Sequence, residues 1–374
     1  MRSDPDPVII AARRTPISTR NRALAGHRVE QLAAPIIRVA LDDVRAETCA
    51  PVTIADVLLG NCMGPGGNPA RVAALAAGLG TEVPGGTIDR QCGSGLAAIV
   101  DAACAIRAGD DRMRVAGGVE SASTAPVRSL NGVPYDRAPF APDGFPDPDM
   151  TRAAQNLATH DGISRARQDT HAARSHVRAR AALAAGRFAA ELVPLAGLDH
   201  DDAIGRAEPL LHRLRPLFPD GTLTAGTSTR ISDGAAVVIV ASAGIAPGLA
   251  LRSSAIVGCD PALPGIGAAP AVQAALRTAG QRIADCAAFE IVEAFAGQSL
   301  AVLDRLGIAD DDPRVCADGG ALALGHPWGA SAAVSVVRLF SRLVRAGAPT
   351  GTVGVAAASV GGGLGIAAVF EVVR

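Results

Sequence analysis

The sequence of 374 residues contains 35 arginines and no lysine. Enzymes that form a Schiff base need a lysine amine, and the phosphate-binding loop of nucleoside triphosphatases needs a lysine side chain. Both classes are therefore excluded. The formal net charge is −1 at pH 7, so the overall charge gives no attraction to nucleic acid or to an anionic membrane surface.

Paired cysteines and long apolar segments are missing as well. An odd number of widely spaced cysteines without a CxxC pair argues against a disulfide framework and against a zinc site. The seven are Cys49, Cys62, Cys92, Cys104, Cys259, Cys286 and Cys316. The N-terminal segment MRSDPDPVIIAARRTP has only a short apolar run before two arginines, too short for a signal peptide or a membrane span. We therefore expect a cytoplasmic protein without a membrane partner.

What the sequence does contain is an alternation of strand-like and helix-like segments, in a chain that is 49% hydrophobic. The apolar segments VIIAARRTP and ADVLLGNC have the character of strands, whereas VEQLAAPIIRVALDDV and ARVAALAAGL have the periodicity of helices. The segment GGTIDRQCGSGLAAIVDAACAIRAG then turns from a short strand through glycines into a long helix. This pattern predicts an α/β fold.

A change of composition divides the chain. Residues 125–224 are rich in Pro, Asp and Arg and contain one clear helix, so we expect an inserted surface subdomain there. Residues 1–124 and 225–248 would form one half of the core, and residues 249–374 the other half. A glycine turn, an Ala-rich helix and a strand follow each other at Cys92–Ser121 and again at His326–Ser359. This similarity suggests a duplication, although Gly- and Ala-rich helices resemble each other through composition alone.

Cys92 is the first candidate for chemistry. It follows the strand-like GGTID and precedes an Ala-rich helix, with Gly93 and Gly95 beside it. A thiol at a helix N-terminus feels the positive end of the helix dipole, so we expect its pKa to be lowered toward thiolate. A buried, inert cysteine is the alternative, because most free cysteines only fill space. The residues alone leave both interpretations open.

His326 lies between glycines in GHPWGAS, immediately before a second Ala-rich helix. A histidine that only packs does not need such a loop, whereas a histidine beside a thiol can activate it for nucleophilic attack. The other histidines lie in polar or charged sequence, and we expect them on the surface: His27, His160, His171, His176, His200 and His212.

A third candidate is the segment Ala358–Gly365, in which an apolar strand ends in three consecutive glycines. Glycines allow a ligand or another chain to approach the backbone closely. Taken alone, however, the segment favours a simple glycine-rich β-hairpin.

Six segments, in order along the chain, resemble the successive signature segments of thiolases: DRQCGSGLAAI, GGVESAS, GTLTAGTSTRISDGAA, VEAFAGQ, GGALALGHPWGASAA and SVGGGLGIAAVFE. The resemblance covers essentially the whole chain. It implies an α/β protein with the duplicated five-layer αβαβα thiolase fold, a loop subdomain that binds coenzyme A, and a homodimer or homotetramer. It also implies an acyltransferase whose substrate is a coenzyme A thioester and which holds no permanently bound cofactor.

Taken position by position, the resemblance also implies roles for individual residues. Cys92 matches the nucleophile that becomes acylated, and His326 matches the base that takes its proton. The backbone N–H groups of Cys92 and Gly361 match the oxyanion hole. The positions that match residues of the acyl, pantetheine and phosphate sites are Met150, Phe295, Thr229, Arg206 and Arg215.

Two departures from the family pattern affect carbon–carbon chemistry. Ser359 stands where the family has a second catalytic cysteine, which moves the α-proton, and an alkanol is a far weaker acid than a thiol of pKa about 8.5. Val292 stands where the family has an asparagine that holds the water beside the enolate oxygen. Losing one such donor costs on the order of 10²–10³ in rate in acyl-transfer enzymes.

Smaller departures lie near the same motifs. Asp318 replaces a frequent asparagine, and Asp149 and Thr151 replace the usual His and Gly beside Met150. Trp328 stands where smaller aliphatic residues are usual. It either reshapes the acyl pocket or packs under the helix that follows.

Three functions remain open at this point. The first is an ordinary thiolase that makes or cleaves a 3-oxoacyl-CoA, with Ser359 compensated by a water or another base. The second is a thiolase-fold acyltransferase, decarboxylative condensing enzyme or thioesterase in which the Claisen step is impaired. The third is a catalytically reduced subunit that stabilises a partner thiolase, against which the retained Cys92 and His326 argue.

Overall fold

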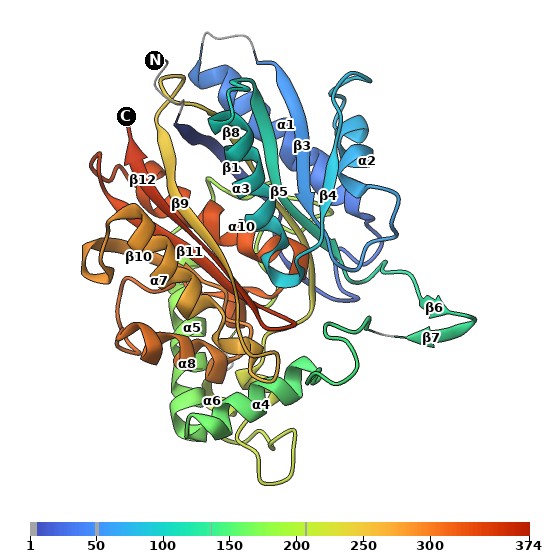
Figure 1. Ribbon diagram of the computed structural model, residues 1–374, viewed down its shortest axis with the longest axis vertical. Coiled ribbons are helices and arrows are strands. Elements are labelled where there is room, and N and C mark those ends of the chain that lie inside the picture. Colours follow the sequence, from blue (N-terminus) through green and yellow to red (C-terminus); the bar gives the residue numbers. More distant parts are fainter. Residues whose placement is uncertain (1–5, 49–51, 136, 206–207) are drawn as a thin grey trace.

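The computed structural model describes residues 6–48, 52–135, 137–205 and 208–374, and a ten-stranded sheet runs through it (Figure 1). The strands lie in the order β10–β11–β12–β9–β1–β8–β5–β3–β4, and β2 (Ser18–Thr19) pairs with β8. Their bounds are β1 (Pro7–Arg14), β3 (Ile54–Gly60), β4 (Gly86–Ile88), β5 (Met113–Ser121), β8 (Ser232–Ser242), β9 (Gly248–Gly258), β10 (Cys286–Ile291), β11 (Val353–Val360) and β12 (Leu364–Val373).

The two halves of the sheet repeat one topology. In the first half β3 is parallel to β5, and β8 and β1 follow as antiparallel neighbours. In the second half β10 is parallel to β11, and β12 and β9 follow in the same way. The halves join where Val8 and Ile9 of β1 pair with Ala250 and Leu249 of β9. The suggested duplication is therefore present in the fold.

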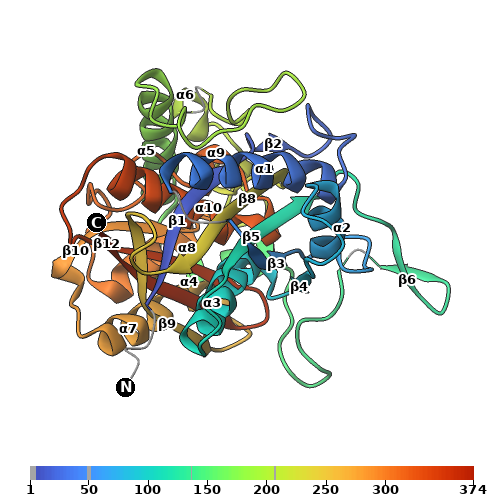
Figure 2. The same cartoon turned by 90° about the horizontal axis from the view of Figure 1, so that it is seen from above.

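Helices form three layers around the two half-sheets (Figure 1 and Figure 2). α1 (Val29–Glu47) and α2 (Pro69–Ala76) cover the outer face of the first half. α7 (Ala268–Ala279) and α8 (Ala296–Leu306) cover the outer face of the second half. α3 (Ser94–Arg107) and α10 (Trp328–Leu339) lie in the middle, in the largest hydrophobic cluster. This arrangement confirms the predicted five-layer α/β fold.

Small residues explain why α3 and α10 can lie side by side. A methyl group added at Gly95 of α3 would lie 2.9 Å from the Ala333 side chain and from the Gly329 carbonyl oxygen of α10. Larger side chains would push the two helices apart, since packed interiors leave no such space. Because Cys92 and His326 each lie just before one of these helices, the close helix contact brings the two residues together.

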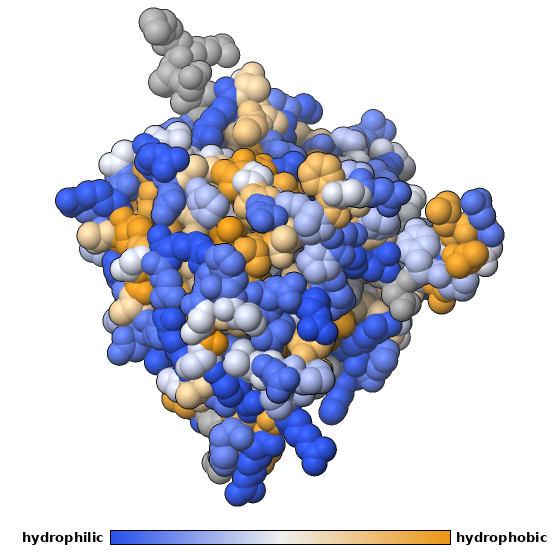
Figure 3. Space-filling view, turned by 60° about the horizontal axis from the view of Figure 1, so that its bottom comes forward, coloured by the Kyte–Doolittle hydropathy of each residue, from blue (hydrophilic) through white to orange (hydrophobic). Residues whose placement is uncertain are grey.

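The segment between β5 and β8 lies at one end of the layers. It contains α4 (Met150–His160), α5 (Arg165–Ala184), α6 (Glu208–Leu211) and a hairpin of β6 (Arg128–Leu130) and β7 (Val133–Tyr135). The hairpin projects from the body, and its apolar residues Val127, Leu130 and Val133 are exposed (Figure 1 and Figure 3). Among the described residues, no helix combines the length and hydropathy that crossing a bilayer would require.

Two histidines of α5 correct the sequence interpretation. His171 and His176 are buried, so the expectation that they lie on the surface was wrong. The reason is that α5 turns this face to the core, where His171 Nε2 lies 3.1 Å from a carboxylate oxygen of Glu293. A helix with many charged residues can still bury polar side chains that find a partner.

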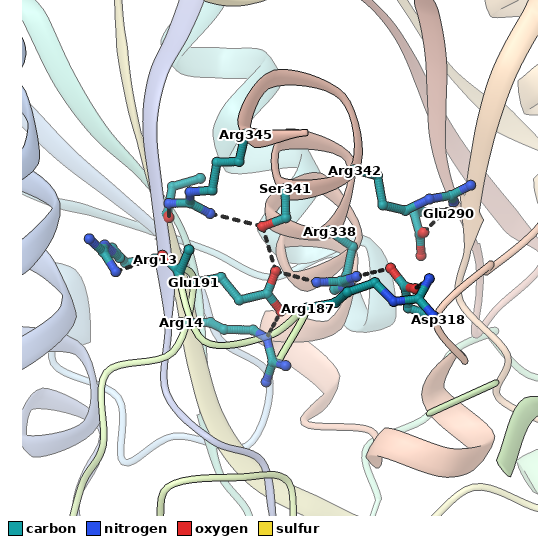
Figure 4. A network of polar contacts seen from close by, with 12 residues as sticks. Arg13, Arg14, Arg187, Glu191, Glu290, Asp318, Arg338, Ser341, Arg342 and Arg345 are labelled. Carbon is teal, nitrogen blue, oxygen red and sulfur yellow. Dashed lines mark hydrogen bonds and ion pairs between the residues drawn. The ribbon is translucent and has the colours of Figure 1, made fainter. Parts of the chain in front are cut away.

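A buried ion network fastens residues 187–201 to the core (Figure 4). Arg14 is fully buried and its guanidinium contacts Glu191 at 2.7 Å and Asp201 at 2.6 Å. Arg338 of α10 contacts both Glu191 and Asp318. Removing one partner of a buried pair typically costs about 3–5 kcal/mol, because the other charge stays buried. The network also gives Asp318, a departure from the family pattern, a clear structural partner.

Candidate active site

Cys92 lies in a tight turn between β4 and α3. The turn is a 3₁₀ helix, Gln91–Gly93, and Gln91 adopts a left-handed backbone with φ of 40°. The Ser94 hydroxyl accepts from the Arg90 N–H at 2.8 Å and donates to the Gln91 carbonyl at 2.6 Å. Strained backbone of this kind costs of order 1–3 kcal/mol and often marks a functional site. The predicted strand, turn and helix around Cys92 are confirmed.

His326 lies between α9 (Ala321–Leu324) and α10, and its side chain faces Cys92. Its Nε2 is 3.3 Å from the Cys92 sulfur, although the two residues are 234 positions apart. On the other side of the ring, Nδ1 is 2.6 Å from the Ser331 hydroxyl, which donates to the Pro327 carbonyl at 2.9 Å. Because the Ser331 hydroxyl donates its proton to the Pro327 carbonyl, its oxygen accepts from the Nδ1–H of His326. This tautomer leaves the Nε2 lone pair toward the thiol.

Burial sets the protonation of this pair. It raises the pKa of Cys92 to about 12, and the nearby carboxylates of Glu120 and Asp89 act in the same direction. It lowers the pKa of His326 to about 4. The expected lowering of the Cys92 pKa by the helix terminus was therefore wrong, because desolvation outweighs the dipole. Both pKa shifts favour a neutral thiol beside a neutral imidazole in the resting site.

Glu120 supports the site from behind. Its carboxylate is fully buried and accepts from the N–H groups of Gly329 at 2.9 Å, Cys62 at 3.1 Å and Met63 at 3.1 Å. It thereby ties the end of β5 to the first turn of α10, which follows His326. The sequence placed Glu120 in a signature segment but assigned it no part in the site.

Gly361 begins the glycine loop between β11 and β12 and lies next to the turn of Cys92. The preceding residue Val360 meets Gly93: a methyl group added at Gly93 would lie 2.9 Å from the Val360 side chain. A methyl group added at Gly361 would lie 2.7 Å from the Phe140 ring and 3.4 Å from the Met150 sulfur. Met150 therefore lies beside Gly361. Phe140 does too, and no motif pointed to it.

Thr229 and Phe295 belong to two extended segments that pair with each other at Ser228 and Phe295. Thr229 donates its N–H to the Ala294 carbonyl at 3.0 Å and its hydroxyl to the Ala321 carbonyl at 2.6 Å. The backbone carbonyl of the following residue, Arg230, accepts from the His326 N–H at 2.9 Å.

Of the two arginines that match phosphate-binding positions, Arg215 is exposed. Arg206 lies outside the described residues.

Ser359 is held by three hydrogen bonds. Its hydroxyl donates to the Gly265 carbonyl at 2.6 Å, and its oxygen accepts from the Ala268 N–H at 3.0 Å and from the Gln298 amide at 3.4 Å. Ala268 is the first residue of α7, so Ser359 satisfies one of the free N–H groups at the start of that helix. The single hydroxyl proton is therefore used within the protein.

Val292 is buried with 4% exposure and lies in the central apolar cluster. It also borders a small cavity of about 20 Å³, together with Ser331, Ser335 and Arg338. A cavity of this size has room for one water. The valine side chain would offer no hydrogen bond to a water in this cavity.

The other departures fit their surroundings. Asp149 begins α4, where its carboxylate accepts from the Thr151 N–H at 2.8 Å, so it acts as a helix cap. Trp328 is half-buried as the first residue of α10.

Comparison with known proteins agrees with this geometry. The thiolase N-terminal domain matches residues 7–244, and the thiolase C-terminal domain matches residues 246–372. A 3-ketoacyl-CoA thiolase of Erwinia tasmaniensis is 40% identical over 388 residues, with 97% of this chain and 98% of that protein covered. An acetyl-CoA acetyltransferase of Pseudomonas aeruginosa is 38% identical over 393 residues, with 97% and 98% covered.

A solved structure extends the likeness to three dimensions. The crystal structure of the acetyl-CoA acetyltransferase of Bacillus anthracis superimposes with a TM-score of 0.90 at 33% identity, and the match covers 100% of both chains. The two matched domains span nearly the whole chain, and the relatives are matched over nearly their full length. The chain therefore belongs to the thiolase family.

Proposed function

We propose that this protein is an acyl-CoA C-acyltransferase that forms an acyl-enzyme on Cys92 and makes or cleaves a 3-oxoacyl-CoA. The observation that carries the proposal is the 3.3 Å contact between His326 Nε2 and the Cys92 sulfur inside a buried site. A thiol and an imidazole at hydrogen-bond distance are the arrangement that nucleophilic catalysis requires.

The first half-reaction follows from the neutral resting pair. As the Cys92 sulfur attacks the thioester carbonyl, its proton moves to His326 Nε2, while Ser331 holds the ring through Nδ1. The carbonyl oxygen becomes an oxyanion that accepts from the N–H groups of Cys92 and Gly361. The carbon–sulfur bond to coenzyme A then breaks, and His326 returns the proton to the leaving thiolate. Acylated Cys92 and free coenzyme A result.

A second function is favoured by Ser359 and Val292. In this alternative the acyl group reaches water, an amine or an alcohol, or a carbanion formed by loss of CO₂, and ordinary Claisen chemistry is impaired. The Ser359 proton is donated to the Gly265 carbonyl, and Val292 gives no polar contact to the cavity that it borders. A non-catalytic partner subunit is the weakest candidate, because it would not need the contact between Cys92 and His326.

Coenzyme A is the proposed substrate carrier, and no permanently bound cofactor is required. We propose that residues 125–224 form an inserted subdomain that binds coenzyme A. One half of the core would consist of residues 1–124 and 225–248, and the other half of residues 249–374. Thr229, Met150 and Phe295 would line the pantetheine and acyl path, and Arg206 and Arg215 would face the phosphates. The exposed guanidinium group of Arg215 suits phosphate oxygens.

We also propose a homodimer or homotetramer in the cytoplasm. The exposed Val127, Leu130 and Val133 of the projecting hairpin and the edge strand β4 are surfaces that a second copy would cover. The six described cysteines are all free, which fits a reducing compartment.

Intact mass spectrometry after incubation with a panel of acyl-CoAs tests the proposed function. We expect the mass of the parent protein to rise by one acyl group, and Cys92→Ala to abolish the adduct. Cys104→Ala is the matched control, because Cys104 is exposed on α3 and should leave acylation unchanged. Product formation without any adduct on Cys92 would contradict the proposal.

A further inference from the structure

We propose that Glu120 is a positioning residue for acylation, because its side chain holds the turn of Cys92 and the helix start beside His326 in one fixed arrangement. The inference rests on the proposed acyl-enzyme, and it adds a residue that sets the separation of the reacting pair. Glu120 lies near the end of β5 and is fully buried. It acts through two neighbours, one on the side of each reacting residue.

The first neighbour, Gly329, links Glu120 to His326. The Glu120 carboxylate accepts from the Gly329 N–H at 2.9 Å, in the first turn of α10. The same turn contains Ser331, whose hydroxyl lies 2.6 Å from His326 Nδ1. A methyl group added at Gly329 would lie 2.8 Å from the Cα of Asn61, so this turn is packed directly on the backbone after β3. A shift of the turn would therefore move the imidazole ring.

The second neighbour, Cys62, links Glu120 to the turn that carries Cys92. The Cys62 N–H donates to Glu120 at 3.1 Å, and the Cys62 thiol donates to the Gln91 carbonyl at 3.1 Å. Gln91 directly precedes Cys92 and has a left-handed φ of 40°, which persists only where the surroundings hold it. Burial raises the pKa of the Cys62 thiol well above its ordinary value, so the sulfur keeps the proton that it donates.

A single oxygen of Glu120 joins the two links. Its Oε2 accepts from both the Gly329 N–H and the Cys62 N–H. Its Oε1 accepts from the Met63 N–H at 3.1 Å and from the Asn61 amide at 3.2 Å, so four donors fix the carboxylate. A misplacement of about 1 Å between reacting groups can cost on the order of 10²-fold in rate. The distance between thiol and imidazole therefore depends on this carboxylate.

The test measures single-turnover acylation of Cys92 over a range of acetyl-CoA concentrations by quenched intact mass spectrometry. Glu120→Gln replaces one oxygen by an amide that cannot accept from the backbone donors. We expect it to lower the saturating rate constant at least about 10-fold and to leave the half-saturating concentration of acetyl-CoA unchanged. Glu290→Gln is the matched control, because Glu290 is also a buried carboxylate but pairs with Arg342 at 2.6 Å. It should lower stability without lowering the rate constant.

Cys62 gives a milder test of the same path. Cys62→Ala removes the donor to the Gln91 carbonyl, and we expect the saturating rate constant to fall about 2–10-fold, as for the loss of one hydrogen bond. Cys62→Ser keeps a donor and should recover most of that loss. A role of Cys62 in packing alone would give no such recovery, since serine is smaller and more polar than cysteine.

The outcomes separate this inference from the proposed function. An unchanged rate constant in Glu120→Gln overturns the inference and leaves the acyl-enzyme intact. Equal losses in Glu120→Gln and Glu290→Gln also overturn it, because the rate would then follow general stability. If Glu120→Gln does not fold, a Cys62→Ala variant as fast as the parent, or a Cys62→Ser variant as slow as Cys62→Ala, overturns it. A parent that acquires no adduct from any acyl-CoA overturns the proposed function and this inference together.

Discussion

Restoring the two family residues at Ser359 and Val292 should recover carbon–carbon chemistry. The double change Ser359→Cys with Val292→Asn puts back a thiol of suitable pKa and an amide beside the cavity that Val292 borders. If the second candidate function holds, the parent should cleave acetoacetyl-CoA with coenzyme A several orders of magnitude more slowly than it acylates Cys92. The double variant should recover part of that difference.

The size of the effect follows from the missing groups. A positioned acid or base contributes about 10²–10⁴ in rate, and an oxyanion donor about 10²–10³. The changes also have a structural cost. Replacing the Ser359 hydroxyl disturbs its bonds to Gly265 and Ala268, and we expect a loss of about 1–2 kcal/mol at the start of α7. The recovered rate should therefore fall short of the full product of the two factors.

The assay follows loss of acetoacetyl-CoA in the parent and in the double variant. Ser359→Ala is the control: if Ser359 only supports the fold, thiolysis should stay within a few-fold of the parent while thermal stability falls. Fast thiolysis by the parent, at about 1–10³ per second, would refute the impaired Claisen step and would mean that another group replaces the missing base, as in an ordinary thiolase. A 100-fold loss in Ser359→Ala would identify Ser359 itself as the acid or base. A slow parent that the double change does not improve would point to a reshaped pocket.

Three further predictions concern the His326 pair and the buried ion network. Ser331→Ala should slow acylation of Cys92 about 10-fold or more, because the His326 ring loses the hydrogen-bond partner of its Nδ1. Ser335→Ala, one turn further along α10, should leave the acylation rate unchanged. Quenched mass spectrometry measures both rates. Burial lowers the pKa of His326, so only the unfolded chain binds this proton between pH 6.5 and about 4, and stability falls as the pH falls. His326→Gln should remove up to about 3 kcal/mol of that decline in urea unfolding curves, and an unchanged decline would contradict the assignment. Glu191→Gln should destabilise the protein by about 3–5 kcal/mol, while the exposed Glu82→Gln should have little effect on the urea midpoint.

The alternation of apolar strands and Ala-rich helices was enough to predict the α/β fold, whereas the duplicated five-layer arrangement was implied by the resemblance to thiolases. Cys92 and His326 could be recognised because each has glycines beside it and stands before a helix that must be buried. Their proximity follows from small residues such as Gly95, which allow α3 and α10 to touch. The glycines and the helix periodicity are local in sequence, so the residues themselves reveal them.

Other parts of the site depend on contacts between distant segments. Phe140 lies in a Pro- and Asp-rich segment, residues 137–147, that has no hydrophobic periodicity. Only the folded chain shows that its ring reaches Gly361. The pKa of Cys92 depends on desolvation by the whole surrounding core, whereas the sequence reveals only the nearby helix terminus. His171 was expected on the surface because it lies in polar sequence, and its partner Glu293 lies 122 residues away, where the local sequence does not reveal it.

The most direct test of the account is the single-turnover rate at which acetyl-CoA acylates Cys92 in the parent and in His326→Ala. The contact of Nε2 with the Cys92 sulfur makes His326 the base for a thiol that is neutral at rest. We predict that acylation of the variant is about 10²–10⁴-fold slower, with Cys92 still the modified residue. Equal rates in parent and variant would show that Cys92 is activated without His326, and the central claim would be wrong.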